Sequence, residues 1–188
     1  FYRAVPTISE EVYNSIKAKY DKYKFAVLGP DIVTADGIHQ NPWIRNGFSK
    51  LDLKKFRIKQ YLRIILSYMR VDKFLFRLLH RHDSRKLGIK GDLLDVPLHG
   101  SALIFSKEYM RYFNGLDART FLYFEEEILR YHCKKRGLLM MYTSDIEIFH
   151  KEDVSTKLAS KKPGDKERQE FRNRIRASKE YENLISLE

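Results

Sequence analysis

Cysteine is almost absent from this chain of 188 residues, since Cys133 is the only one. A single cysteine excludes an internal disulfide and fits a reducing compartment, so we expect a cytoplasmic protein. With 43% hydrophobic residues, a chain of this length buries roughly two-thirds of its unfolded surface without help from a disulfide or a metal. These features are typical of one globular domain that spans residues 1–188.

Long apolar runs are missing too. The longest apolar stretch, YLRIILSYM at 61–69, contains Arg63, whereas a membrane-spanning helix needs about 20 apolar residues. The chain begins at Phe1, and its first residues, FYRAV, lack the sections of a signal peptide. We therefore expect an excised piece of a longer protein, located in the cytoplasm or peripherally on the inner face of the membrane.

The periodicity of apolar residues predicts helices that alternate with strands. Val12, Ile16 and Tyr20 are four residues apart, which indicates an amphipathic helix over 10–23. The other expected elements are strands at 24–29 and 31–34 with a turn at Gly29-Pro30 between them, a strand at 101–106, a short helix at 107–113, a helix at 124–137, a strand at 138–143 and a C-terminal helix at 162–188. This alternation predicts an α/β fold.

Positive charge is concentrated in one segment, residues 45–90, which holds 14 Lys or Arg side chains and only three Asp. The excess equals the net charge of the whole chain, +11. Large apolar residues are interleaved with the basic ones, which predicts an amphipathic helical insert. Three interpretations are open: the insert packs on the domain with a solvated basic face, lies on an anionic membrane surface, or binds nucleic acid. Nucleic acid is the least favoured, because the chain has no zinc-finger spacing, RNA-recognition signature or Gly-rich clamp.

Negative charge gathers at one place, in FLYFEEEILRYHCKKRG at 121–137. Carboxylates at the start of a helix meet the positive end of its dipole, so Glu125, Glu126 and Glu127 are first expected to stabilise a helix start. Successive helical residues point about 100° apart, so at most one or two of the three can line a site. Repulsion between neighbouring carboxylates can raise one pKa and leave a general base that works near neutral pH.

A wider pattern, residues 96–156, resembles the C-terminal half of the family 2 glycosyltransferases. The family shows, in this order, a strand entered through glycine and a small residue, a helix, a G-F-D turn, an acidic pair that opens a helix, a glycine stop and a strand that ends in histidine. The corresponding positions here are Gly100-Ser101, 107–113, Gly115-Leu116-Asp117, Glu125-Glu126, Gly137 and His150. VLGPDIVTADGIHQ at 27–40 is similar to the family's preceding strand and turn, so the resemblance covers 75 of the 188 residues and rests on the order and spacing of its parts.

The resemblance implies a GT-A fold, of which this chain would be the acceptor-side half with a helical basic insert at 45–90. It implies inverting transfer of a sugar from a nucleotide sugar to a saccharide or lipid-linked acceptor in surface polysaccharide synthesis. Glu126 matches the family's general base; because the family more often has Asp there, Glu125 is the alternative. His150 matches a histidine that helps to hold Mg²⁺ or Mn²⁺ on the departing diphosphate. Gly100, Ser101 and His99 would lie beside the bound sugar.

One part of the family pattern is missing. No Asp-x-Asp occurs in the 188 residues, although this motif binds the metal in the nucleotide-binding half of the family. We expect that half to precede Phe1. The chain alone should then bind nucleotide sugar weakly, hold no metal and be inactive. The alternative function is a non-enzymatic basic module that binds anionic membrane or nucleic acid, with the acids serving only as a helix cap.

Overall fold

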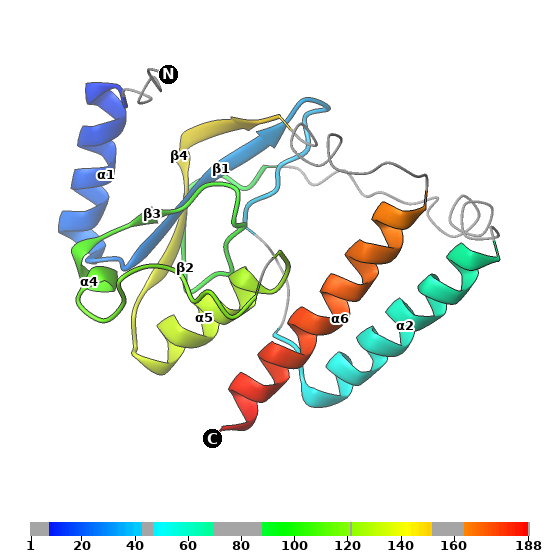
Figure 1. Cartoon of the computed structure of the whole chain (residues 1–188). Helices are drawn as coiled ribbons and strands as arrows, with labels where there is room; N and C mark the ends of the chain where they lie inside the picture. The colour runs from blue at the N-terminus through cyan, green and yellow to red at the C-terminus, as the bar shows by residue number, and fades with distance from the viewer. Residues whose placement is uncertain (1–7, 43–46, 70–87, 121, 152–163, 188) are drawn as a thin grey trace, which may run out of the picture.

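The computed structural model describes residues 8–42, 47–69, 88–120, 122–151 and 164–187 (Figure 1). Within these ranges the chain is mixed α/β, with a four-stranded sheet of order β2-β4-β1-β3. The strands are β1 (Val27–Thr34), β2 (Asp92–Leu94), β3 (Ile104–Phe105) and β4 (Met140–His150). The helices are α1 (Glu10–Tyr23), α2 (Lys50–Tyr68), α4 (Lys107–Met110), α5 (Glu125–Lys135) and α6 (Asp165–Ser186). The expected α/β class is confirmed.

Two parallel strands, β1 and β4, form the centre of the sheet, and the short strands β2 and β3 pair antiparallel at its edges. The turn expected at Gly29-Pro30 is wrong, because β1 continues through it to Thr34. Proline has no N–H for the ladder. The strand tolerates Pro30 because the register against β4 shifts between Pro30 and Asp31, and such a bulge interrupts the ladder locally.

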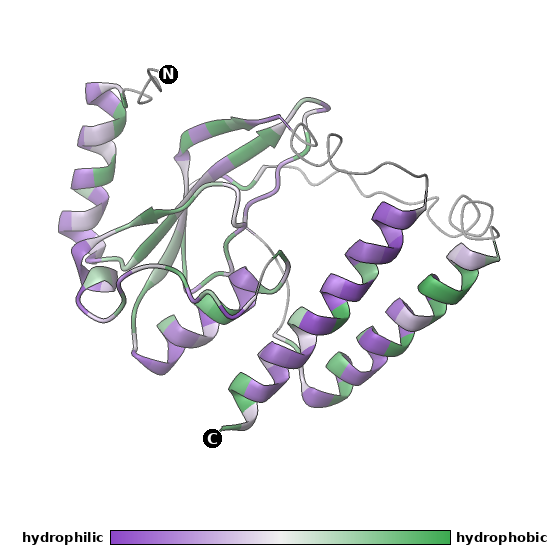
Figure 2. Cartoon of the chain, in the orientation of Figure 1, coloured by the Kyte–Doolittle hydropathy of each residue, from purple (hydrophilic) through white to green (hydrophobic). Residues whose placement is uncertain are grey.

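The central strands send alternate side chains to two cores. Val27 of β1 and Met140 of β4 pack with Leu129 and Cys133 of α5. Leu28 and Met141 pack with the apolar face of α1. The sheet therefore lies between α1 on one face and α5 on the other, and its strands combine hydrophobic and hydrophilic stretches (Figure 2).

A third core joins the basic insert to the C-terminal helix. Helices α2 and α6 lie side by side, away from the sheet (Figure 1). Leu53 of α2, Phe124 and Ile128 beside α5, and Tyr181 of α6 belong to one buried cluster. The helix predicted over 162–188 is confirmed as α6, and one helix of the predicted insert as α2. The insert's residues 70–87 lie outside the described residues.

Several predicted boundaries differ from the structure. The strand expected at 101–106 is reduced to Ile104–Phe105, and the strand expected at 138–143 extends to His150. Strand β2 was not predicted, because a three-residue strand carries no clear periodicity and forms only by pairing with β4. Within the described ranges no helix combines the length and the apolar character needed to cross a membrane.

Candidate active site at the start of helix α5

A cavity of about 810 Å³ lies between the start of α5, the segment that connects β2 to β3, and the helices α2 and α6. It brings together five of the six site residues expected from the sequence. These are Glu125 and Glu126 from α5 and the consecutive residues His99, Gly100 and Ser101. The helices α2 and α6 add a wall that contains Phe56, Lys59, Gln60, Arg63 and Arg174.

Glu126 contacts the backbone of Gly100 directly. The Gly100 N–H donates a hydrogen bond to Glu126 Oε1 over 3.1 Å. A Cβ atom at position 100 would lie 2.7 Å from the same oxygen, closer than side chains tolerate. A larger residue at position 100 would therefore push the flexible Glu126 side chain aside, and two parts of the sequence pattern that are 26 residues apart meet at one hydrogen bond.

The three residues before the acids have a left-handed backbone. Leu122, Tyr123 and Phe124 have φ angles of 62°, 76° and 68°, a conformation that costs a non-glycine residue about 1–2 kcal/mol. Burial of Phe124 offsets this strain, because its ring lies 5.3 Å from Phe48 and 5.5 Å from Phe56, centroid to centroid. Strained backbone of this kind is often found at functional sites.

The left-handed turn gives the first two acids different surroundings. Burial, together with the negative charge of Glu126, raises the pKa of Glu125, although the backbone N–H groups of Glu125 and Leu122 act to lower it. Glu126 reaches across to Gly100 instead. Glu126 therefore makes a contact that a helix cap does not need, and Glu125 lies beside it in the same cavity wall.

Gln60, which lines the same cavity, carries a buried polar atom without a partner among the described residues. Gln60 of α2 is buried, and the atom is its Oε1. Nearly all buried polar atoms in folded proteins have a partner, so an acceptor without one calls for an explanation. Gln60 was not singled out from the sequence, because only the packing of α2 on α6 turns this side chain inward.

Two histidines are oriented by the segment that follows β1. The buried Asn41 donates from Nδ2 to the carbonyl of Pro30 over 2.8 Å and accepts from the His99 N–H over 2.7 Å. His150 Nδ1 lies 2.9 Å from Gln40 Oε1. The Ser101 hydroxyl lies between the two imidazoles, 2.8 Å from His99 Nδ1 and 3.4 Å from His150 Nδ1. His150, the sixth expected residue, therefore adjoins the cavity through Ser101.

These two imidazoles do not complete a metal site. No group of three or more His, Cys, Asp or Glu side chains that could hold a metal ion occurs in the described part of the chain. His99 and His150 have ring centroids 6.2 Å apart, and both Nδ1 atoms contact Ser101. Further ligands would have to come from outside the described residues.

Positive charge in the cavity wall comes from Lys59 and Arg63 of α2 and from Arg174 of α6. The guanidinium carbons of Arg63 and Arg174 lie 5.7 Å and 5.9 Å from the centre of the Phe171 ring. Burial and the charge of Arg174 lower the pKa of Arg63. Arginine guanidinium groups pair well with phosphate or carboxylate, so this wall suits an anionic group. Lys59 and Arg63 belong to the basic segment 45–90 that the sequence singled out, whereas nothing in the sequence pointed to Arg174.

Comparison with known proteins does not assign this chain to a family. No family model, no curated protein and no solved structure matches it. Its function is therefore inferred from the geometry of the cavity and from the sequence pattern that the cavity residues follow.

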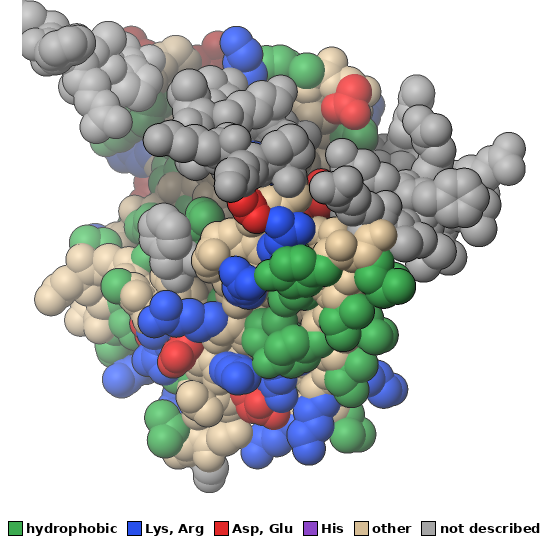
Figure 3. Space-filling model, turned by 45° about the vertical axis from the view of Figure 1, so that its right-hand side comes forward, with side chains coloured by type: hydrophobic (Ala, Val, Ile, Leu, Met, Phe, Trp, Pro, Cys, Tyr) green, Lys and Arg blue, Asp and Glu red, His purple; other side chains and the backbone are tan. Residues whose placement is uncertain are grey.

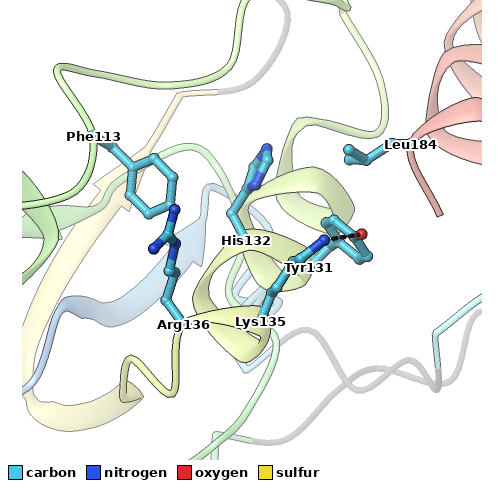
Figure 4. A pocket seen from close by; sticks show the side chains of 6 residues that line it. All are labelled: Phe113, Tyr131, His132, Lys135, Arg136 and Leu184. Atoms are coloured by element: carbon cyan, nitrogen blue, oxygen red, sulfur yellow. Dashed lines mark hydrogen bonds between the residues drawn. The ribbon is translucent and has the colours of Figure 1, made fainter. Parts of the chain in front are cut away.

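A second, smaller cavity of about 520 Å³ lies on the other side of α5 (Figure 4). Phe113 and Leu184 form its apolar sides, while His132 and Arg136 project from α5. His132 Nε2 lies 2.9 Å from Asp117 Oδ2, so this region ties the Gly115-Leu116-Asp117 turn to α5. None of the expected site residues lies here, and we assign the region a structural role.

Asp117 is expected to make stability depend on pH. Burial acts to raise the pKa of Asp117, but hydrogen bonds from Arg119 and His132 outweigh it and lower the pKa to about 2. A lowered pKa stabilises the fold fully above the ordinary carboxyl pKa, and this contribution is lost as the pH falls toward 2. Asp117→Asn should cost about 2 kcal/mol near pH 7, and about half of that difference should be gone by pH 3.

Urea unfolding of the wild type and Asp117→Asn between pH 7 and pH 3 measures this difference. Asp21→Asn is the matched control, since the Asp21 side chain is exposed and its ion pair with Lys24 lies in solvent. A pH-independent difference between the wild type and Asp117→Asn would contradict the role of the ionised carboxylate.

Proposed function

We propose that the cavity is the acceptor site of an inverting glycosyltransferase, and that this chain is the acceptor-side half of a GT-A-like catalytic domain. The observation that carries the proposal is the hydrogen bond from the Gly100 N–H to Glu126, beside Ser101 in the wall of a cavity of about 810 Å³. A volume of this size accommodates a sugar with part of its acceptor. The carboxylate, the small residues and the aromatic wall are what a saccharide site needs.

In the proposed reaction an acceptor hydroxyl attacks the anomeric carbon of a nucleotide sugar. The new carbon–oxygen bond forms as the bond to the nucleoside diphosphate breaks, and the leaving diphosphate takes the electron pair. The hydroxyl proton passes to Glu126, which acts as the general base. Attack from the face opposite the leaving group inverts the anomeric centre. Glu125 is the alternative base, because its raised pKa suits proton transfer nearer neutral pH.

Other side chains of the cavity would bind and orient the substrates. Gln60 Oε1 can accept a hydrogen bond from a sugar hydroxyl, which would satisfy this buried atom. Arg63 and Arg174 can pair with a phosphate of the donor or of a lipid-linked acceptor. The resemblance to the family also implies Mg²⁺ or Mn²⁺ on the donor diphosphate. The described residues do not gather its ligands, so the proposed steps use protein side chains alone.

Saccharide binding by this chain tests the proposal without a donor. We expect a panel of monosaccharides and disaccharides at millimolar concentration to shift the NMR signals of the Gly100 and Ser101 amides. Gly100→Ala should weaken this binding by at least about tenfold, because the new Cβ would displace the Glu126 carboxylate.

Gly47→Ala is the matched control, because a Cβ there would lie 3.7 Å from the Arg130 side chain, at ordinary contact distance. If no saccharide in the panel shifts these amides, the acceptor-site proposal is wrong. The non-enzymatic basic module would then be the better explanation of the chain.

A further inference from the structure

The outward face of α2 carries an unusual row of large apolar side chains. Its members, Leu51, Ile58, Leu62, Ile65 and Met69, are all more than half exposed. At 100° per residue they fall within an arc of about 60° on the helix surface. Leu53, Gln60 and Ser67 occupy the opposite, buried face. Figure 3 shows hydrophobic side chains gathered in a continuous patch on this side of the molecule. We call these five residues the α2 stripe.

Basic and amphipathic side chains border the α2 stripe. Lys54, Lys55 and Lys59 are exposed and lie on both sides of it, and Figure 3 shows Lys and Arg side chains around the patch. Tyr61 and Tyr68 are exposed at one edge. An apolar row between lysines, with tyrosines at the margin, is the pattern of helices that lie in the headgroup region of a bilayer.

The charge of the chain favours a lipid surface over another protein as the binding partner of the α2 stripe. Residues 45–90, which include α2, carry an excess of positive charge equal to the net charge of the whole chain, +11. An anionic membrane attracts such a segment, while the apolar row gains by entering the acyl boundary. A protein partner would need a matching apolar groove with acid on both sides, whereas an anionic bilayer offers both features without special shape.

We propose that the α2 stripe docks this protein on an anionic membrane surface. Ile58, Leu62, Ile65 and Met69 follow one another at three or four residues, and Leu51 lies on the same face two turns earlier, so the five members can enter the bilayer together. The helix then lies parallel to the membrane plane, with Lys54, Lys55 and Lys59 at the level of the lipid phosphates.

The same helix forms a wall of the candidate active site. Lys59 is exposed beside the α2 stripe and also lines the cavity, and Arg63 lines it one turn further along. A membrane-docked α2 would therefore place the cavity mouth next to the headgroups. The consequence, which rests on the proposed glycosyltransferase function, is that the acceptor is lipid-linked and that its phosphate meets Lys59 and Arg63.

Vesicle sedimentation tests the docking surface. We expect the chain to sediment with vesicles of phosphatidylcholine and phosphatidylglycerol at about 0.1 M salt, and to remain in solution with phosphatidylcholine alone. Leu62→Glu should weaken binding at least about tenfold, because it removes an inserted side chain and adds a negative charge. Replacing Lys54 and Lys55 by Gln should weaken it roughly fivefold per lysine.

The control variant is Tyr13→Glu, which makes a comparable change at an exposed apolar residue on α1 and should leave sedimentation unchanged. Thermal melts of all variants establish that each is folded. Failure of the wild type to bind the anionic vesicles, or equal binding by Leu62→Glu, overturns the proposal. So does a dimer in light scattering that Leu62→Glu dissociates, or retention of an oligonucleotide in place of vesicles.

This experiment is independent of the proposed chemistry, because it uses neither donor nor acceptor. Loss of saccharide binding in Gly100→Ala does not change the vesicle result, since Gly100 lies in the cavity and outside the α2 stripe. The two proposals can therefore fail separately.

Discussion

Glu126→Gln in the complete protein is expected to lower the rate of sugar transfer by roughly 10²–10⁴-fold, the usual contribution of a general base. The substitution keeps the shape of the side chain and an oxygen that can accept the hydrogen bond from the Gly100 N–H. It removes only the ability to take a proton. The acceptor should therefore still bind, and the loss should appear in kcat with little change in KM.

Two further variants serve as a control and as a test of the alternative base. Glu10→Gln changes another acid in the first turn of a helix, far from the cavity on α1, and should leave transfer unchanged. Glu125→Gln separates the two candidate bases. If Glu125 were the base, its raised pKa would place the acidic limb of the pH–rate profile above the ordinary range for glutamate, and the variant would lose this limb. Full activity in Glu126→Gln would rule out Glu126 as the base.

Leu53→Ala is expected to have the largest effect on stability, lowering the free energy of unfolding by about 3 kcal/mol. Leu53 of α2 is 0% exposed. It packs with Phe124 and Tyr181 where α2 meets α5 and α6. Truncation removes apolar contacts and leaves a space that this interface of three helices cannot easily close. The wall of the cavity should also loosen, because α2 carries Phe56 and Gln60.

Leu51→Ala is the matched control for this substitution. It makes the same chemical change two residues earlier in the same helix, but Leu51 is 67% exposed, so its cost should stay within about 0.5 kcal/mol. Urea unfolding with linear extrapolation measures both values. A similar cost for Leu51→Ala and Leu53→Ala would contradict this orientation of α2.

The sequence was sufficient to predict elements with a strong local signal. Helix α1 has its four-residue apolar spacing, and α5 has acid at its start and base at its end. The short strands β2 and β3 could not be predicted with their bounds, because their pairing depends on strands far away in the chain. The order of short motifs placed Gly100 and Glu126 in one pattern, and the structure joins them by a hydrogen bond; that they form a site stays a prediction.

The amino-acid sequence by itself determined the properties that depend on composition and local spacing. These are the absence of an internal disulfide, the concentration of positive charge in residues 45–90, and the amphipathic character of α1, α2 and α6. Each follows from which residues are present and how far apart they lie along the chain.

Only the tertiary structure decided which face of α2 is buried, since large apolar residues occur on both faces and periodicity cannot choose between them. Packing on α6 and on Phe124 buries Leu53 and turns Gln60 toward the cavity. The left-handed turn at 122–124 sets how the chain enters α5, and in this arrangement Glu126 accepts a hydrogen bond from the Gly100 N–H. The rotation of a helix about its axis is set by the backbone that enters it and by the surfaces it contacts, and both come from distant parts of the chain.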